Sequence, residues 1–500
     1  MTSWAHGYVA DSPYTFAYQA AQAPGNLALI CAMMGVAWEP RPRMVVCDIG
    51  CGRGCTVNTL AAANPGWTMV GLDYNPAHIA EAAALAERAE LENAIFVEAD
   101  LAEMTDAEID RLPEMDVVTV HGVWTWVSDA VRQGIVRVLA RRLKPGGVCY
   151  MGYNAMPGFG ADMALQRLFR HLAAQQHSGS SPMRAQAAIE TIKLLHATRP
   201  ANLPATPMLK RIAEDEKALD PAYLAHEFLT SHWRPVFFED LLADLAPAKL
   251  DYVGSATLHE NVPDLLFSTE QREIFESMPM GPVREFMKDV CIGRIFRRDV
   301  FVRGLRRTDP LAALDRIVLG AVRELDLETP KLAVPVGQAE IGLDLWEPMM
   351  AALNEGPQSL GRLRSLPVNR SPNPAELATV LSGTGLVLPA LRDTGPTEEA
   401  MRYNRAVALS YAQEGRGGGL YALASPVLAA GLPCIWLELA VAIQPETALL
   451  RTGEDTAALG HTLAQRLVSD LGGEALTSAG EVLGNMLRER PPIWRRFGII

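Results

Sequence analysis

The stretch VVCDIGCGRGC, residues 45–55, decides the fold. It joins an apolar run, which is typical of a buried strand, to a turn that holds Gly50, Gly52 and Gly54. A helical pattern follows over residues 54–63. Glycines between a strand and a helix let a ligand approach the backbone closely. The stretch therefore predicts a strand–turn–helix unit with a binding site at its turn.

Apolar runs and helical stretches alternate along the first third of the chain. Strands are predicted at 44–50, 68–74, 94–100, 115–123 and 148–154, helices at 24–34, 54–63, 76–91 and 129–143, and a turn at 144–147. This alternation indicates a parallel sheet that helices cover on both faces. Two later runs, 249–258 and 297–304, are predicted as the sixth and seventh strands. The expected fold class is α/β, with a doubly wound, seven-stranded Rossmann-like sheet.

The predicted domain organisation has three parts. Residues 1–305 form the α/β domain, with a helical insertion at about 176–235 over the carboxyl edge of the sheet, where ligands bind. Residues 306–400 are helical, with a spacing that permits a winged-helix-like module, and 401–500 form a C-terminal mixed α+β domain. The segment 418–442 is predicted to supply a small hairpin and a helix.

Composition excludes several classes of protein. The net charge of -13 over 500 residues disfavours nucleic-acid binding, which needs a basic surface. Pro and Gly interrupt the apolar runs, so no integral membrane segment is predicted. The N-terminus lacks the pattern of a secretory signal, and seven cysteines in so long a chain favour a reducing, cytoplasmic location. The oligomeric state stays open, with a homodimer as one option.

Three cysteines in the opening stretch raise the question of a metal site. Cys47, Cys51 and Cys55 have the spacing C-x3-C-x3-C. Structural zinc sites use C-x2-C pairs together with a second pair or with histidines, and no such set is evident. Cys47 also falls in the strand pattern, where a small apolar side chain packs well. No metal site is predicted.

Acidic residues at the ends of three successive strands identify the expected ligand. A dinucleotide fingerprint would need glycine at position 55, and Asp48 would repel a pyrophosphate but suit an ammonium group. Asp73 ends the second strand and can accept both hydroxyl protons of a ribose. Asp100, with Leu101 beside it, ends the third strand and is placed to meet an adenine amino group. S-adenosylmethionine has an amino group, a ribose, an adenine and no phosphate, so it is the predicted cofactor.

Longer stretches of the chain resemble a known family. They are GYVADSPYTFAY, CDIGCGRGCTVNTLAAANPGW, GLDYNPAHIAEA, HGVWTWVSDAVRQGIV, LKPGGVCYMGYNAMPG and FRRDVFVRG, which run in order from residue 7 to about 304. They are similar to the class I S-adenosylmethionine-dependent methyltransferases that carry a methyltransferase regulatory domain. The layout is also similar to that of bacterial lysine methyltransferases that act on outer-membrane proteins. The resemblance implies an enzyme, with protein lysine methylation as one candidate activity.

The expected cofactor site combines the resemblance with the strand-end pattern. The residues assigned to it are Tyr14, Asp48, Gly50, Cys51, Gly52, Asp73, Tyr74, Asp100, Leu101, His121 and Gly122. By resemblance, the aromatic segment around Tyr14 closes over the cofactor.

The methyl acceptor is expected beyond the fourth strand, where HGVWTWV follows. Trp124 and Trp126 are candidates for the acceptor wall, but alternate residues of an extended segment face opposite ways, so one of the two is expected in the core. His121 is a candidate general base, with lining of the cofactor pocket as the alternative. Tyr153 and Asn154 are placed to orient an acceptor, or to form the turn that follows.

Three functions stay open at this point. The leading hypothesis is a methyltransferase that modifies lysine side chains of a protein partner. A small-molecule methyltransferase, acting on a sugar or natural product beneath the inserted helices, is the second. A non-catalytic, adenosylmethionine-binding regulatory protein is the third.

Overall fold

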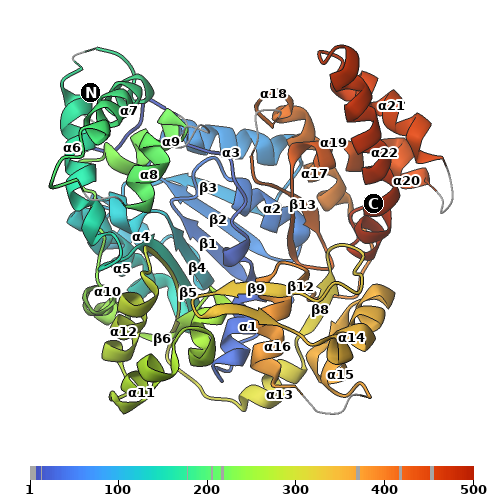
Figure 1. The fold of residues 1–500 in the computed structure, drawn as a ribbon, viewed down its shortest axis with the longest axis horizontal. Helices are drawn as coiled ribbons and strands as arrows, with labels where there is room; N and C mark the ends of the chain where they lie inside the picture. Colours follow the sequence, from blue (N-terminus) through green and yellow to red (C-terminus); the bar gives the residue numbers. More distant parts are fainter. Residues whose placement is uncertain are drawn as a thin grey trace.

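A seven-stranded sheet forms the centre of the computed structural model, which describes residues 7–12, 14–176, 178–203, 206–214, 219–367, 372–415, 419–450 and 455–500. The strand order is β3-β2-β1-β4-β5-β7-β6 (Figure 1). The strands are β1 Val45–Ile49, β2 Thr68–Asp73, β3 Ala94–Glu98, β4 Met115–His121, β5 Leu143–Asn154, β6 Leu250–Ser255 and β7 Phe296–Arg303. Strand β7 is antiparallel to β5 and β6, whereas the others pair in parallel. The predicted α/β fold class and both late strands are confirmed.

The strand order reverses between β1 and β4. Strand β1 pairs with β2 on one side and with β4 on the other. The loops that leave β1 and β4 therefore diverge at the carboxyl edge of the sheet, and they leave a crevice between them. The glycine turn at the end of β1 lies at this crevice.

Helices cover both faces of the sheet because the strands are apolar on both faces. The helices are α1 Pro24–Met33, α2 Cys55–Ala63, α3 Pro76–Arg88, α4 Asp106–Ile109, α5 Asp129–Arg142 and α10 Phe238–Leu245. Alternate strand residues join two different cores: Val46, Val117 and Tyr150 pack with α1 and α2, whereas Cys47, Val118 and Met151 pack with α5 and α10. Such double burial is expected of parallel strands.

The start of β5 differs from the prediction. We expected a turn at 144–147, but β5 begins at Leu143 and continues through these residues. Leu143 pairs with Met115, and the register then shifts before Val148 pairs with Val117. Gly146 has φ +79, so the chain is irregular there. The Pro-Gly-Gly sequence therefore marks a break in the register between β4 and β5, and it does not form a turn ahead of the strand.

An insertion between β5 and β6 is mainly helical. Its helices are α6 Met163–Ala174, α7 Ser181–Ala197, α8 Pro207–Ala213 and α9 Pro221–Phe228. They form their own apolar core and lie beside the N-terminal segment (Figure 1). Helix α6 lies before the expected start at 176. Helices α11 Thr269–Ser277 and α12 Pro282–Ile292 separate β6 from β7.

The remainder of the chain contains short strands and helices. They are α13 Pro310–Asp315, β8 Val318–Ala321, β9 Lys331–Val334, β10 Gly337–Glu340, α14 Leu343–Glu355, β11 Gln358–Ser359, α15 Leu360–Arg364, α16 Pro374–Gly383 and β12 Val387–Pro389, followed by α17 Glu398–Ser410, α18 Ala412–Gly415, β13 Tyr421–Ser425, β14 Ala430–Cys434, α19 Trp436–Ala442, α20 Pro445–Leu449, α21 Thr456–Leu467 and α22 Gly473–Arg496. The hairpin β13–β14 and helix α19 confirm what 418–442 predicted in its described part. The divisions at 305/306 and 400/401 and the winged-helix assignment stay predictions.

The last hundred residues pack directly on the α/β domain. Helix α17 and the β13–β14 hairpin contact α2, the helix that follows the glycine turn (Figure 1). Tyr403, Leu423 and Trp436 belong to the same apolar core as Leu60 of α2. The hydroxyls of Thr59 and Tyr403 are 2.7 Å apart, and both are buried. The C-terminal part thus covers a helix of the cofactor domain.

None of the helices in the described ranges is both long and apolar enough to cross a membrane.

Two glycines offer a matched test of how tightly the glycine turn packs. Gly54 and Gly146 have nearly equal φ, +77 and +79, but a Cβ on Gly54 would lie 2.5 Å from the Cβ of Ala82, whereas a Cβ on Gly146 would meet nothing within 4 Å. We expect Gly146→Ala to cost about 1–2 kcal/mol for the left-handed backbone alone. Gly54→Ala should cost about 1–3 kcal/mol more, because of overpacking. Thermal unfolding of both variants measures the difference, and equal melting temperatures would contradict this packing.

Candidate functional site

The glycine turn is held in a conformation that only glycine adopts readily. Gly50, Gly52 and Gly54 have φ of +77, +53 and +77. The backbone N–H groups of Gly50 and Cys51 both donate to the carbonyl oxygen of Leu72, at 2.7 and 3.0 Å. A Cβ on Gly50 would lie 2.2 Å from Cγ2 of Val123, in the loop after β4. The turn is therefore tied to β2 and packed against β4.

The carboxylate of Asp73 is fixed beside this turn. Its Oδ2 accepts from the backbone N–H of Gly52 at 2.8 Å, and its Oδ1 accepts from that of Asn75 at 2.8 Å. Nδ1 of His78 lies 3.3 Å from Oδ1. These bonds fix the direction of the carboxylate at the end of β2, as a ribose-binding acid requires.

The acid predicted for the adenine lies after β3. Oδ1 of Asp100 accepts from the backbone N–H of Ala102 at 3.0 Å. Burial raises the pKa of Tyr74, and so do the nearby charges of Asp100 and Glu98. Leu101 is buried, and α5 packs on its carbonyl so closely that a Cβ on Gly134 would lie 1.9 Å from that oxygen. The structure thus brings Asp73, Tyr74, Asp100 and Leu101 to neighbouring strand ends.

Asp48 lies beneath the glycine turn, inside the protein. Oγ1 of Thr119 donates to its Oδ1 at 2.7 Å. Burial raises the pKa of Asp48 to about 7, the hydrogen bond from Thr119 lowers it in part, and the charge of Asp73 raises it. A buried carboxylate of this kind favours a cationic partner.

Tyr14 lies across the crevice. Its Cδ1 is 4.0 Å from where a Cβ on Gly52 would stand, and its hydroxyl is 4.0 Å from where a Cβ on Gly122 would stand. Gly122, with φ +67, follows β4. The ring therefore bridges the β1 and β4 loops over a cradle that side chains would fill. This cradle, the Asp73 carboxylate and the buried Asp48 fit the ribose and ammonium groups of S-adenosylmethionine.

His121 ends β4 next to this cradle. Its Nδ1 lies 2.9 Å from the hydroxyl of Tyr150, and a Cβ on Gly152 would lie 2.5 Å from the same nitrogen. Burial lowers the pKa of His121 to about 4, helped by the charge of Arg298. The imidazole is therefore neutral at physiological pH, and it is a weak base.

The three cysteines of the opening stretch are in separate places. Cys47 is buried in β1, Cys55 is buried in the first turn of α2, and Cys51 is half-buried in the glycine turn. Burial raises the pKa of all three thiols. Each is a small apolar side chain at its own position.

A cavity opens beside Tyr14 and Gly122. We call it the aromatic pocket, and its lining is Tyr8, Tyr14, Gly122, Trp126, Tyr223, His226 and Glu227. The ring of Tyr14 meets that of His226 edge-on, with centroids 5.2 Å apart. The β4 loop, the N-terminal segment and helix α9 each contribute to this pocket.

Glu227 is the acidic group of the aromatic pocket. Its Oε1 accepts from Nδ2 of Asn154 at 2.9 Å and from Nε1 of Trp233 at 3.5 Å. Nε1 of Trp126 donates to the backbone carbonyl of Glu227 at 3.1 Å. Burial raises the pKa of Glu227 to about 7, and the bonds from Asn154 and Trp233 lower it in part.

The predicted acceptor residues fall into two groups. Trp126 and Asn154 contact Glu227 and the aromatic pocket. Trp124 is fully buried in the core beneath α5, and the Tyr153 hydroxyl donates to Asp299 Oδ2 at 2.5 Å inside that core. Both tryptophans are buried, in different cores, and residues 124–126 form a short 3-10 helix and not the extended segment that we expected.

Sequence reasoning did not single out α9. Its sequence PAYLAHEF places Tyr223, His226 and Glu227 at i, i+3 and i+4, which is one helix face. The signal available in the sequence was an acidic residue and a histidine that share a helix face with residues that are buried. That face meets the crevice only because the insertion folds back over the sheet edge.

Two family models match the chain in the regions just described. A methyltransferase domain matches residues 47–149, and a predicted methyltransferase regulatory domain matches residues 220–303. Fold and site together define an S-adenosylmethionine-dependent methyltransferase. Within that class, the chain carries the methyltransferase regulatory domain that contributes α9, β6 and β7.

Solved structures and curated proteins agree with this fold. PKMT2 from Rickettsia typhi, solved in complex with AdoHcy, superposes with a TM-score of 0.69 at 16% identity, and it covers 97% of this chain and 99% of its own. An uncharacterized protein of Synechocystis is 28% identical over 401 residues, 78% of each chain. Trans-aconitate 2-methyltransferase of Acidovorax is 32% identical over 137 residues, which are 27% of this chain and 46% of its own.

The buried carboxylate of Asp48 should affect stability and cofactor binding in opposite directions. Its pKa is raised from 3.8 to about 7, so the folded protein loses stability as pH rises from about 4 to 7, by about 4 kcal/mol in total. Asp48→Asn removes this loss and should melt at a higher temperature than the wild type at pH 8, but not at pH 4. The same variant should bind S-adenosylmethionine at least tenfold more weakly at pH 8, because the charge opposite its ammonium is lost. Calorimetry and melting curves measure both, and unchanged affinity would refute the assignment of Asp48.

Substitutions at Asp73 and at the three cysteines test whether the carboxylate or the thiols are needed for cofactor binding. Asp73→Ala should abolish detectable cofactor binding, because it removes the carboxylate that accepts from two backbone N–H groups and is expected to bind the ribose. Alanine at Cys47, Cys51 or Cys55 should retain binding, with at most a modest loss of melting temperature. Titration calorimetry on the four variants tests this, and a cysteine variant that folds but does not bind would contradict it.

Proposed function

We propose that this methyltransferase transfers methyl groups to lysine side chains of a protein partner, in the aromatic pocket. The observation that carries the proposal is Glu227, a buried carboxylate surrounded by Tyr8, Tyr14, Trp126 and Tyr223 next to the cofactor cradle. A carboxylate and aromatic faces both attract an alkylammonium group.

The share of the chain that each relative matches supports a protein acceptor. PKMT2, a lysine methyltransferase, matches almost the whole chain, including the inserted and C-terminal parts. The trans-aconitate methyltransferases match at most 137 residues, about the length of the cofactor-binding half of the sheet. The parts of the chain that a small acceptor does not need are thus shared with PKMT2.

Lysine methylation requires the amine to lose its proton before it attacks. S-adenosylmethionine, when bound, supplies a methyl group on a positively charged sulfur. Above about pH 7 the carboxylate of Glu227 is ionised, so it can hold an arriving ammonium group and then accept its proton. Aromatic surroundings lower the pKa of the amine by desolvation, which favours that transfer. His121, with a pKa of about 4, accepts protons less readily, and we assign it to the wall of the cradle.

Tyr14 lines both the cradle and the aromatic pocket. Its ring lies near Gly52 and Gly122, and it also meets the ring of His226 edge-on. We infer that it separates the cofactor from water and helps to align the amine with the methyl group, as an in-line displacement requires. Asn154 holds Oε1 of Glu227 in place during this approach.

Labelling with S-adenosylmethionine that carries a radioactive methyl group tests the acceptor. The enzyme, incubated with a bacterial lysate, should label protein bands, and digestion should recover methyl-lysine. Label confined to small molecules would overturn the protein acceptor and favour the small-molecule alternative. Cofactor binding without any label would favour the regulatory alternative.

Glu227→Gln should lower labelling of the protein acceptor at least tenfold, because the variant keeps the hydrogen-bonding shape but can neither hold an ammonium nor accept its proton. AdoHcy affinity should stay within twofold of the wild type. Glu190→Gln, at an exposed carboxylate of α7, is the matched control and should label normally. Full activity of Glu227→Gln would contradict the proposed acceptor site.

The pH dependence of kcat also tests the role of Glu227. The pKa of Glu227 is raised to about 7, so kcat at saturating S-adenosylmethionine should rise with pH through that value as the carboxylate ionises. Asp48 titrates in the same range, but its effect falls on the KM for the cofactor and not on kcat at saturation. A kcat rise near pH 7 that persists in Glu227→Gln would exclude Glu227 as its source.

A further inference from the structure

Arg53 links the glycine turn to the C-terminal part of the chain. It stands between Gly52 and Gly54, and its side chain is only 9% exposed. Nη1 and Nη2 donate to the two carboxylate oxygens of Glu414, in α18, at 2.6 and 2.8 Å. Nε lies 2.9 Å from both oxygens of Glu81, in α3. The guanidinium thus joins three parts of the chain.

Two stacked aromatic rings lie beside the same guanidinium. Its central carbon lies 5.6 Å from the ring centroid of Phe16 and 5.2 Å from that of Tyr411. Phe16 and Tyr411 stack with centroids 4.0 Å apart, and the Tyr411 hydroxyl donates to Oε1 of Glu81 at 2.6 Å. We call Phe16, Arg53, Glu81, Tyr411 and Glu414 the Arg53 clamp.

The clamp also holds the segment that covers the cofactor cradle. Nη1 of Arg53 donates to the backbone carbonyl of Tyr14 at 3.3 Å. Four residues later, the backbone N–H of Tyr18 donates to the carbonyl of Leu420 at 2.8 Å. The backbone of Tyr14, whose ring lies over Gly52 and Gly122, is therefore linked through Arg53 to Glu414, and Tyr18 bonds directly to the backbone of the C-terminal part.

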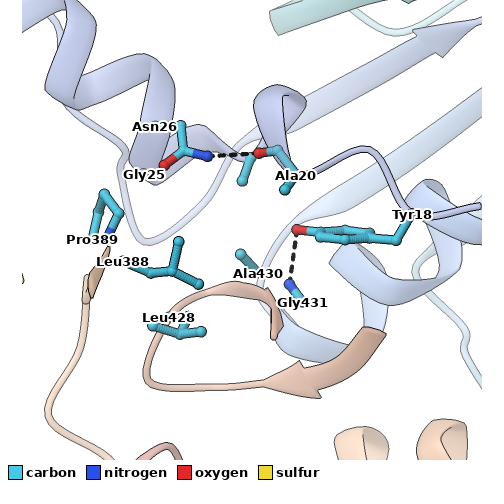
Figure 2. A pocket seen from close by; sticks show the side chains of 10 residues that line it. Tyr18, Ala20, Gly25, Asn26, Leu388, Pro389, Leu428, Ala430 and Gly431 are labelled. Carbon is cyan, nitrogen blue, oxygen red and sulfur yellow. Dashed lines mark hydrogen bonds between the residues drawn. The ribbon is translucent and has the colours of Figure 1, made fainter. Parts of the chain in front are cut away.

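Figure 2 shows how the same segment continues. The Tyr18 hydroxyl accepts from the backbone N–H of Gly431 at 2.9 Å, and Asn26 donates to the carbonyl of Ala20 at 2.6 Å. Between them is a cavity whose C-terminal wall includes Leu388, Pro389, Leu428 and Ala430. Residues 14–26 thus run along the C-terminal part, with the ring of Tyr14 over Gly52 and Gly122 and with Oε1 of Gln22 3.5 Å from the Thr119 hydroxyl that donates to Asp48.

We propose that Tyr411 and Glu414 are positioning residues for the cofactor: through Arg53 they hold Tyr14 over the cradle, so that cofactor affinity depends on the C-terminal part. Neither residue lines the cradle or the aromatic pocket, so they act on affinity through Arg53 and the N-terminal segment. Without Glu414 the nearly buried guanidinium keeps only Glu81 as a carboxylate partner, and on its Glu414 side it has to seek water or another acceptor, which is costly. Loss of Glu414 therefore moves Arg53, and with it the carbonyl of Tyr14 and the turn on which Gly52 lies.

Glu414→Gln tests the proposal in the full-length protein. We expect the Kd for AdoHcy and the KM for S-adenosylmethionine to rise about tenfold, within the usual range for coupling between sites, while kcat at saturating cofactor stays within twofold. Hydrogen exchange at residues 14–22 should become faster. Glu414→Asp, which restores the charge, should recover most of the affinity. Tyr411→Phe removes only the hydroxyl bond to Glu81 and should show a smaller effect in the same direction.

The matched control is Glu446→Gln. Like Glu414, Glu446 forms an ion pair with an arginine; its partner is Arg466, at 2.9 Å. The side chain of Glu446 is 37% exposed, and that of Glu414 is 48% exposed. It should bind AdoHcy normally. Wild-type affinity in Glu414→Gln, or weaker affinity without faster exchange at residues 14–22, would overturn the proposal. A joint fall of kcat and melting temperature that Glu414→Asp fails to rescue would also overturn it, because that is the signature of a purely structural role.

Discussion

The hydrogen bond from the backbone N–H of Gly52 to the carboxylate of Asp73 is the constraint on which the site depends. It forms only because Gly50, Gly52 and Gly54 adopt left-handed backbone angles, which turn the chain sharply between β1 and α2. The turn then lies close to β2 and leaves an open cradle beneath Tyr14. Every other feature of the site is placed relative to this turn: Asp48 below it, Gly122 across from it and Arg53 behind it.

Two buried carboxylates supply the negative charge that the proposed cationic ligands need. Asp48 and Glu227 both have a pKa raised to about 7 by burial. Each lies on one side of the crevice, Asp48 under the cradle and Glu227 in the aromatic pocket. Keeping a carboxylate in such a place lowers the stability of the folded protein, so a cationic ligand is the natural compensation. The arrangement suits a reaction between a cofactor with an ammonium group and an amine acceptor.

The fold, and the meeting of the predicted cofactor residues at one edge of the sheet, were largely predictable from sequence. Apolar strands, Ala-rich helices and strand-end acids are local patterns, and the structure has the seven strands where they were expected, apart from the early start of β5. The acceptor half was less predictable. Trp126 and Asn154 contact Glu227, but Glu227 comes from a helix about 70 residues after Asn154. No local sequence pattern predicts a contact between residues so far apart in the chain.

The sequence alone determined the class of sheet, the glycine turn and the identity of the cofactor, because these depend on residues that are close together in the chain or at successive strand ends. Tertiary structure alone decided which side chains line the aromatic pocket and which hold Tyr14 over the cradle. Glu227 and Tyr8 approach Trp126 only when the insertion folds over the sheet edge, and Arg53 meets Glu414 across 361 positions of sequence. Contacts of that range depend on how whole elements pack, and a pattern of neighbouring residues does not encode them.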